Sequence, residues 1–161
     1  AEDTIENTMR SVINQTYESL EYIIIDGASR DSTLSIVNKL QQETNHESIT
    51  KNIEMIVISE KDQGIYDAMN KGVAMATGDV VGLLNSDDFY ATDDVLSVIA
   101  EEFSRSDALD AIYGDVHYVD ENDITKVVRY YSSQQFARER MLAGYLPAHP
   151  SFYARRECHH K

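Results

Sequence analysis

Apolar positions along the chain follow two alternating spacings. In residues 3–15 they recur, from Ile5 to Ile13, at the three- and four-residue spacing of an amphipathic helix. Residues 21–26 are instead a continuous, largely β-branched run that ends in an acid, which is typical of a strand buried on both faces. The same alternation continues downstream and predicts helices at residues 31–42, 65–76 and 93–103 and strands at residues 53–59 and 79–84.

This order of elements predicts a fold of the α/β class. Strands that alternate with helices pair in parallel through right-handed crossovers. Residues 111–116 and 124–130 add two tyrosine-rich strand candidates around a turn-like acidic stretch at residues 120–123, so we expect a mixed, mainly parallel sheet flanked by helices. We expect the sheet to be incomplete at both ends, because a helix begins without a preceding hydrophobic strand and a strand near residue 149 has no closing helix.

Size and charge narrow the class of protein. With 161 residues, 42% of them hydrophobic, the chain is long enough for one core, and we expect a single domain over residues 1–161. Acids outnumber bases 28 to 14 and the net charge is −14, which argues against a nucleic-acid partner. The sequence shows no transmembrane run and no secretory leader, and its single cysteine, Cys158, forms no internal disulfide, so a cytoplasmic location is predicted.

Acids follow several predicted strands at the point where each strand ends. Asp26 and Asp62 lie just beyond two of them, and Asp87 and Asp88 end the apolar run that begins at Leu83. Ligands of open α/β sheets bind beyond the carboxyl ends of the strands. Two adjacent carboxylates repel each other and contribute nothing to packing, so they indicate a divalent cation with phosphate oxygens as its other ligands. The chain is therefore a candidate nucleotide-dependent enzyme.

Three segments together resemble the family 2 glycosyltransferases, inverting enzymes of the Rossmann-like GT-A fold that move a sugar from a nucleotide donor. They are residues 4–33, residues 59–79, which begin SEKDQGIYDAMNKG, and LNSDD at residues 84–88. The joint match in order and spacing is specific, although each piece alone is weak. The resemblance implies a nucleotide-sugar-binding part at about residues 1–90 and an acceptor-side part at about residues 108–161.

The resemblance also assigns roles on the donor side. Asp26 matches the acid that hydrogen-bonds the nucleotide base, although an acid beside Gly27 is also typical of a turn, and the family more commonly has a second Asp at position 27. Asp62 would line the ribose and diphosphate. Asn85-Ser86-Asp87 occupies the place of the DxD motif, so that Asn85 would contact ribose and Asp87, assisted by Asp88, would bind Mg²⁺ or Mn²⁺; the alternative is a plain loop.

On the acceptor side the resemblance points to Asp115 and His149 as possible catalytic residues, each with a structural alternative as a turn former or a packed histidine. The family's catalytic base lies in an acidic motif beyond the region that matches His149, and neither this motif nor the family's opening strand is found in the sequence. We therefore assign no base, and we expect a fragment that retains part of the donor site.

The function that this resemblance implies is transfer of a sugar with inversion, from a nucleotide sugar, with a UDP-sugar favoured, to a glycan or lipid-linked acceptor in polysaccharide or cell-envelope glycan synthesis. Two alternatives stay open, a non-catalytic nucleotide-binding fragment and a sugar nucleotidyltransferase, although the Gly-rich loop of the latter is not seen. A homo-oligomer is also possible, because a sheet without its first strand would expose apolar surface.

Overall fold

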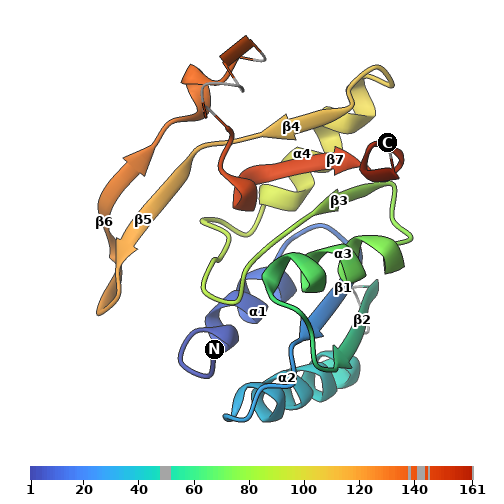
Figure 1. The fold of residues 1–161 in the computed structure, drawn as a ribbon, viewed down its shortest axis with the longest axis vertical. Coiled ribbons are helices and arrows are strands. Elements are labelled where there is room, and N and C mark those ends of the chain that lie inside the picture. The colour runs from blue at the N-terminus through green and yellow to red at the C-terminus, as the bar shows by residue number, and fades with distance from the viewer. Residues whose placement is uncertain (48–51, 138, 141–143, 145, 161) are drawn as a thin grey trace.

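The computed structural model describes residues 1–47, 52–137, 139–140, 144 and 146–160, and Figure 1 shows its fold. It confirms the α/β class. The helices are α1 (Ile5–Ile13), α2 (Thr33–Glu47), α3 (Ile65–Met75) and α4 (Val95–Arg105). The strands are β1 (Ser19–Asp26), β2 (Asn52–Ser59), β3 (Val80–Gly82), β4 (Ala111–Tyr113), β5 (Val116–Asp120), β6 (Asp123–Tyr131) and β7 (Phe152–Arg155), with short 3-10 turns η1 (Ser133–Gln135), η3 (His149–Ser151) and η4 (Arg156–His160).

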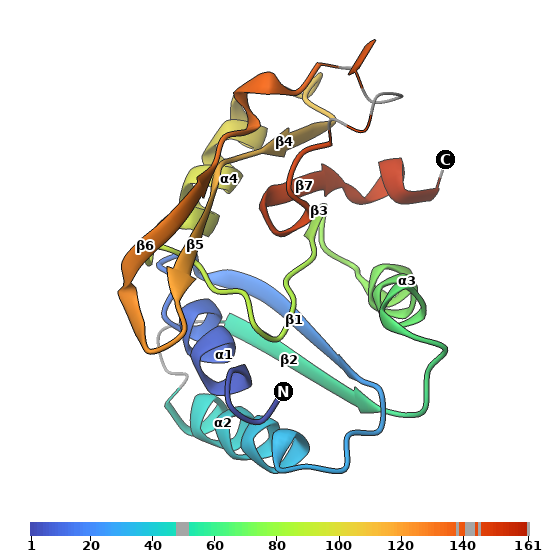
Figure 2. The same cartoon turned by 60° about the vertical axis from the view of Figure 1, so that its left-hand side comes forward.

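The first half of the chain forms a three-layer unit around two parallel strands. β1 and β2 pair in parallel over their whole length, from Ser19 opposite Asn52 to Asp26 opposite Ser59. Helices α1 and α2 pack on one face of this pair and α3 lies on the other (Figure 2). Because the strands are covered on both sides, their sequences are nearly continuous apolar runs, as parallel strands require.

The second half places β7 between β3 and β4, antiparallel to both. The direction of β7 follows from its entry point: Ser151, just before β7, donates a hydrogen bond from Oγ to the carbonyl oxygen of Gly114 at the end of β4 (2.8 Å). The chain thus re-enters the sheet where β4 leaves it and must run the opposite way. In the described residues parallel pairing is therefore confined to β1 and β2, fewer strands than the sequence predicts.

Strands β5 and β6 form an antiparallel hairpin that stands apart from both other sheets (Figure 1). The sequence predicts one strand over residues 111–116, but the structure breaks it at Gly114 and Asp115, so that β4 belongs to the β3–β7–β4 sheet and β5 to the hairpin. The predicted acidic turn at residues 120–123 is confirmed, because Asp120 pairs with Asp123 across it. Large apolar side chains stay exposed on the hairpin, among them Val128 and Tyr130.

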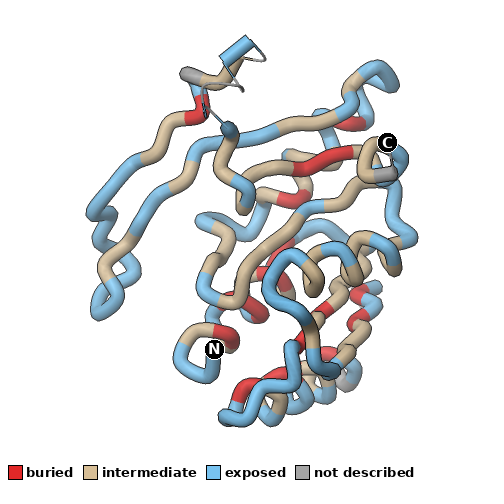
Figure 3. The backbone as a smooth tube through the Cα atoms, in the orientation of Figure 1, coloured by how far each residue is buried: buried red, intermediate tan, exposed pale blue. Residues whose placement is uncertain are grey.

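Burial is concentrated in two separate cores (Figure 3). The larger core joins α1 and α2 to the parallel strands, and the smaller one joins α4 to β7 through Leu96, Phe103 and Tyr153. Within the described part of the chain, no helix is long and apolar enough to cross a membrane. The buried members of the first core are Ile5, Met9, Ile24, Val37, Leu40 and Met55.

Candidate functional site

The loop that follows β3 carries the candidate metal residues and contacts His149. The Asn85 side-chain amide donates one hydrogen bond to Asp88 Oδ2 (3.0 Å) and another to His149 Nε2 (2.7 Å). Because an amide nitrogen only donates, Nε2 of His149 is the acceptor and carries no proton in this arrangement. The side chain of Asn85 therefore joins the acidic loop to the turn η3, which lies 64 residues further along the chain.

The two adjacent acids of this loop differ in exposure. Asp87 is exposed, whereas Asp88 is half-buried. Burial raises the pKa of the Asp88 carboxyl above its ordinary value, and the charge of Asp87 adds to the rise, while the hydrogen bonds with Asn85 offset part of it. The carboxylate pair is thus electrostatically unfavourable, and a bound cation would relieve the repulsion.

Polar side chains on α1 and just beyond its end hold the segment that contains the two acids. Thr8 donates from Oγ1 to the Ser86 carbonyl oxygen (2.9 Å), and Ser11 Oγ accepts from the Tyr90 backbone N–H (3.2 Å). Gln15, 1% exposed, donates from Nε2 to the Thr92 carbonyl oxygen (2.7 Å) and accepts from the Leu96 N–H (2.9 Å). The sequence prediction missed these residues. Their three- and four-residue spacing is the signal that could have found them.

Asp26, the predicted base-binding residue, is buried at the end of β1 with only 6% of its surface exposed. Its carboxylate accepts from the Ser29 backbone N–H (3.2 and 3.3 Å) and from Ser59 Oγ (2.5 Å). Burial alone would raise the pKa of Asp26, but the hydrogen bonds from Ser29 and Ser59 outweigh it and lower the pKa below its ordinary value. Asp26 is therefore a stable anion that ties the end of β1 to the end of β2.

Asp62 lies in the loop between β2 and α3, close to the same strand end. Its Oδ1 accepts from the Gly64 backbone N–H (2.9 Å), and its carboxylate lies against Gly27, directly after β1. Gly64 has a φ of +113°, a conformation that favours glycine, so the loop's tight turn depends on that residue.

The chain's first residue and helix α1 contact the loops after β1 and β3 respectively. The Ala1 amino group pairs with Asp31 beyond β1 (3.1 Å), and Thr8 holds Ser86 beyond β3 (2.9 Å). Asp62 lies beside Gly27, directly after Asp26, whereas Asn85, Asp87 and Asp88 form a second group in the loop after β3. Both groups follow strand ends, where ligands of α/β sheets bind.

Asp115 lies between β4 and the hairpin, and both of its carboxylate oxygens are engaged. Oδ2 accepts from the Tyr130 hydroxyl and Oδ1 from the Ser133 backbone N–H (2.7 Å). These hydrogen bonds, that of Tyr130 first, lower the pKa of Asp115. Ser133 also donates from Oγ to the Gly114 carbonyl oxygen (2.6 Å), so Asp115 fixes the base of the hairpin.

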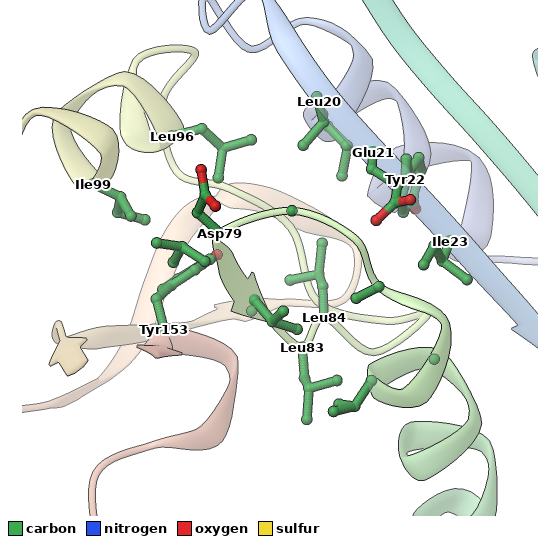
Figure 4. Close-up of a pocket in the computed structure, with 18 of the residues that line it drawn as sticks. Leu20, Glu21, Tyr22, Ile23, Asp79, Leu83, Leu84, Leu96, Ile99 and Tyr153 are labelled. Atoms are coloured by element: carbon green, nitrogen blue, oxygen red, sulfur yellow. The ribbon is translucent and has the colours of Figure 1, made fainter. Parts of the chain in front are cut away.

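A cavity of about 940 Å³ lies between the edges of β1 and β3, which do not pair with each other (Figure 4). Its walls come from β1, β3, α3, α4 and the segment after β3, and they include the aliphatic side chains of Leu20, Ile23, Leu83 and Leu84. The acidic loop reaches it at Asn85, Ser86 and Asp87. Polar and charged side chains also line this space, among them Glu21, Asp79 and Arg155.

The carboxylates of the loop could supply some, but not all, of the ligands of a hard divalent cation. Among the described residues no group of three or more His, Cys, Asp or Glu side chains is arranged to hold a metal ion. Mg²⁺ and Mn²⁺, however, are commonly bound by one or two carboxylates together with substrate phosphate oxygens rather than by a complete protein cage. The exposed Asp87 and the half-buried Asp88 match that donor set.

Comparison with known proteins places these features in a family. The model of glycosyl transferase family 2 matches residues 1–156. A PGL/p-HBAD biosynthesis glycosyltransferase of Mycobacterium bovis is 35% identical over 106 residues, which are 66% of this chain and 39% of that protein. The chondroitin synthase of Pasteurella multocida is 28% identical over 155 residues, 96% of this chain and 15% of that protein.

Solved structures bear out the fold. S. aureus TarS, residues 1–349, in complex with UDP, matches with a TM-score of 0.56 and 22% identity, over 68% of this chain and 30% of that one. The chain thus spans well under half the length of these relatives. The match of the family model over nearly all of the sequence, together with the GT-A architecture, shows that the chain belongs to glycosyl transferase family 2.

Proposed function

We propose that this chain forms the donor-binding part of an enzyme that transfers a sugar from a nucleotide sugar, with inversion, to a glycan or lipid-linked acceptor. The observation that carries the proposal is the loop after β3, in which Asn85 joins Asp88 to His149 and leaves the Asp87 carboxylate exposed at the strand end. Family membership supplies the reaction class. The UDP bound by S. aureus TarS supports a UDP-sugar as the donor.

The candidate site residues would bind two parts of the nucleotide-sugar donor, its diphosphate and its nucleoside. Asp87, with Asp88, would hold Mg²⁺ or Mn²⁺, which GT-A glycosyltransferases generally use and which neutralises charge on the departing nucleoside diphosphate. Asn85 keeps its side-chain oxygen for a ribose hydroxyl, because both amide hydrogens are donated to Asp88 and His149. Asp26 and Asp62 lie at the neighbouring strand ends, where the nucleoside would extend.

For the acceptor side, about residues 108–161, His149 is favoured over Asp115. The His149 ring is exposed and hydrogen-bonds Asn85, so it lies beside the candidate metal loop. Asp115 has a lowered pKa and both oxygens engaged, which suits a structural anion better than a base. The proposal also includes a role in polysaccharide or cell-envelope synthesis and a cytoplasmic location. It further includes pairing of two copies of the chain through the free strand edges.

The experiment is a release assay. The chain is incubated with UDP-glucose, UDP-N-acetylglucosamine and UDP-galactose, each with Mg²⁺ or Mn²⁺, and UDP release is measured. We expect metal-dependent release from one donor, its loss in Asp87→Ala and its retention in Asp93→Ala, a matched change of an exposed acid six residues away. Binding of UDP without release would favour the non-catalytic alternative, and neither binding nor release would contradict the donor site itself.

A further inference from the structure

The loop after β3 carries both candidate metal carboxylates and has no regular structure to place them. Residues 83–92 contain neither helix nor strand. Within the loop, the Asp88 backbone N–H donates to the Asn85 carbonyl oxygen (3.1 Å) and closes a turn around Ser86 and Asp87. This bond shapes the turn but does not place it relative to the rest of the fold. The position of the two acids therefore depends on side chains that bind the turn from outside.

Thr8 binds this turn from helix α1. Its Oγ1 donates to the Ser86 carbonyl oxygen (2.9 Å), and the residue is only 2% exposed. That carbonyl belongs to the peptide group that leads into Asp87. Because a peptide group is planar, fixing its oxygen also fixes the direction in which the Asp87 backbone continues. Burial keeps water from replacing the threonine hydroxyl as the donor.

Two consecutive residues of the turn are bound by different parts of the molecule. Asn85 hydrogen-bonds His149 (2.7 Å), which comes from η3, directly before β7. Ser86 is bound by Thr8, which belongs to the helix that packs with β1 and β2. With both bonds present, the peptide group between Ser86 and Asp87 is held at both ends of the Ser86 residue, whereas without the Thr8 bond its orientation is free to change.

The hydroxyl at position 8 is explained by this bond and not by packing. Valine has nearly the same shape as threonine and would bury no polar group, and a buried hydroxyl without a partner is unfavourable. Thr44 of α2 offers a contrast within the same chain. It is also buried, but its Oγ1 donates to the Leu40 carbonyl oxygen of its own helix (2.8 Å), the usual local partner of a helical threonine. The Thr8 hydroxyl instead reaches a residue 78 positions away along the chain.

Ser11 makes a second contact of the same kind one turn further along α1. Its Oγ accepts from the Tyr90 backbone N–H (3.2 Å) and donates to the Thr8 carbonyl oxygen (2.7 Å). Residues three positions apart on a helix lie on the same face, so Thr8 and Ser11 both face the loop. Their two contacts lie on either side of Asp87 and Asp88 in the sequence.

We propose that Thr8, supported by Ser11, is a positioning residue of the metal site: its hydroxyl orients the peptide group before Asp87, and through it the Asp87 carboxylate, toward the cation that binds the donor diphosphate. This inference rests on the proposed function and deepens it. Thr8 contacts neither the cation nor the donor. It strengthens binding because a carboxylate already held in place does not have to be ordered when the ligand binds.

The test is calorimetric titration of the chain with UDP in excess Mn²⁺. Thr8→Val keeps the shape of the side chain and removes the hydroxyl, and we expect the dissociation constant of UDP to rise about three- to tenfold, as for loss of one hydrogen bond. The binding stoichiometry should stay that of the wild type, which a mere loss of folded protein would lower. Thr8→Ser keeps the hydroxyl and should restore most of the affinity.

Two controls separate positioning from a general loss of structure. Thr44→Val removes a buried helical hydroxyl that does not contact the loop, and it should bind UDP as the wild type does. Uridine lacks the diphosphate, so its affinity, measured by displacement of UDP, should be the same in the wild type and in Thr8→Val. An equal loss of affinity for uridine and for UDP would place the effect away from the cation and overturn the inference.

The remaining outcomes distinguish the inference from the proposed function. If the wild type binds UDP with Mn²⁺ and Thr8→Val binds it equally tightly, or if Thr8→Ser binds it as weakly as Thr8→Val, the inference fails while the proposed function stands. If the wild type binds no UDP, both fail. Should Thr8→Val not fold, Ser11→Ala decides: weaker UDP binding at unchanged stoichiometry supports the inference, and binding equal to that of the wild type overturns it.

Discussion

Replacement of Gln15 by methionine tests how α1 holds the candidate site. Met has nearly the length of Gln but does not donate or accept the same hydrogen bonds. The change removes the bond from Gln15 Nε2 to the Thr92 carbonyl oxygen (2.7 Å) and the bond from the Leu96 N–H to Oε1 (2.9 Å). These bonds join the end of α1 to the start of α4, and the segment that carries Asp87 and Asp88 lies just before them.

The loss of unfolding free energy expected for Gln15→Met follows from the burial of these hydrogen bonds. A hydrogen bond contributes about 0.5–1.5 kcal/mol net, and a buried donor left without a partner costs about 1–3 kcal/mol. Leu96 is 8% exposed, so its N–H has little access to water once Gln15 is replaced. The two effects together predict a loss of about 2–4 kcal/mol in unfolding free energy, which corresponds to a melting temperature lower by roughly 5–15 °C for a chain of this size.

Thermal unfolding followed by circular dichroism measures this effect, with Asn14→Met as the matched control. Asn14 is the exposed neighbour of Gln15, so the same methionine there should change stability by less than about 0.5 kcal/mol. A Gln15→Met variant as stable as Asn14→Met would refute the claim that these buried hydrogen bonds hold the loop to α1.

Two further substitutions probe the framework of the site. Gly82→Ala places a methyl group against the Tyr153 ring, whose Cζ would lie 2.8 Å from the new methyl carbon. We expect the unfolding free energy, measured in urea, to fall by about 1–3 kcal/mol. Stability equal to that of Gly72→Ala, a control whose new Cβ would meet Ile25 Cγ1 at an ordinary 3.7 Å, would contradict this packing. The lowered pKa of Asp26 stabilises the fold above the carboxyl's unfolded pKa of about 3.9, and this stabilisation is lost as pH falls through the lower folded pKa. The stability advantage of wild type over Asp26→Asn, measured in urea, should therefore be present at about pH 7 and shrink below about pH 4; a difference that does not change with pH would argue against it.

Much of the fold is encoded in local spacing. The predicted helix at residues 3–15 is α1 (Ile5–Ile13), and the β-branched run at residues 21–26 lies within β1 (Ser19–Asp26). Pairing is a different matter, because it depends on where the chain re-enters the sheet. The antiparallel position of β7 follows from the contact of Ser151 with Gly114, which no local pattern reveals. The break at Asp115 likewise depends on its bonds to Tyr130 and Ser133.

The sequence alone predicts the site residues that are recognised by their chemistry. It does not predict the residues whose role depends on tertiary packing. The acids after β1, β2 and β3 stand out because acids at the ends of apolar strands contribute little to packing. The polar side chains of Thr8, Ser11 and Gln15 look like an ordinary solvent-facing helix row, yet Thr8 and Gln15 are buried against the loop after β3. The need for glycine at position 27 also depends on Asp62, a tertiary neighbour.

The most direct test of the central claim is titration of the chain with UDP, with and without Mn²⁺, for wild type and Asp87→Ala. The account predicts binding by the wild type that requires Mn²⁺ and that is lost in Asp87→Ala, because the exposed carboxylate after β3 would hold the cation that binds the diphosphate. Binding by Asp87→Ala equal to that of the wild type, or no binding by the wild type under either condition, would contradict the account.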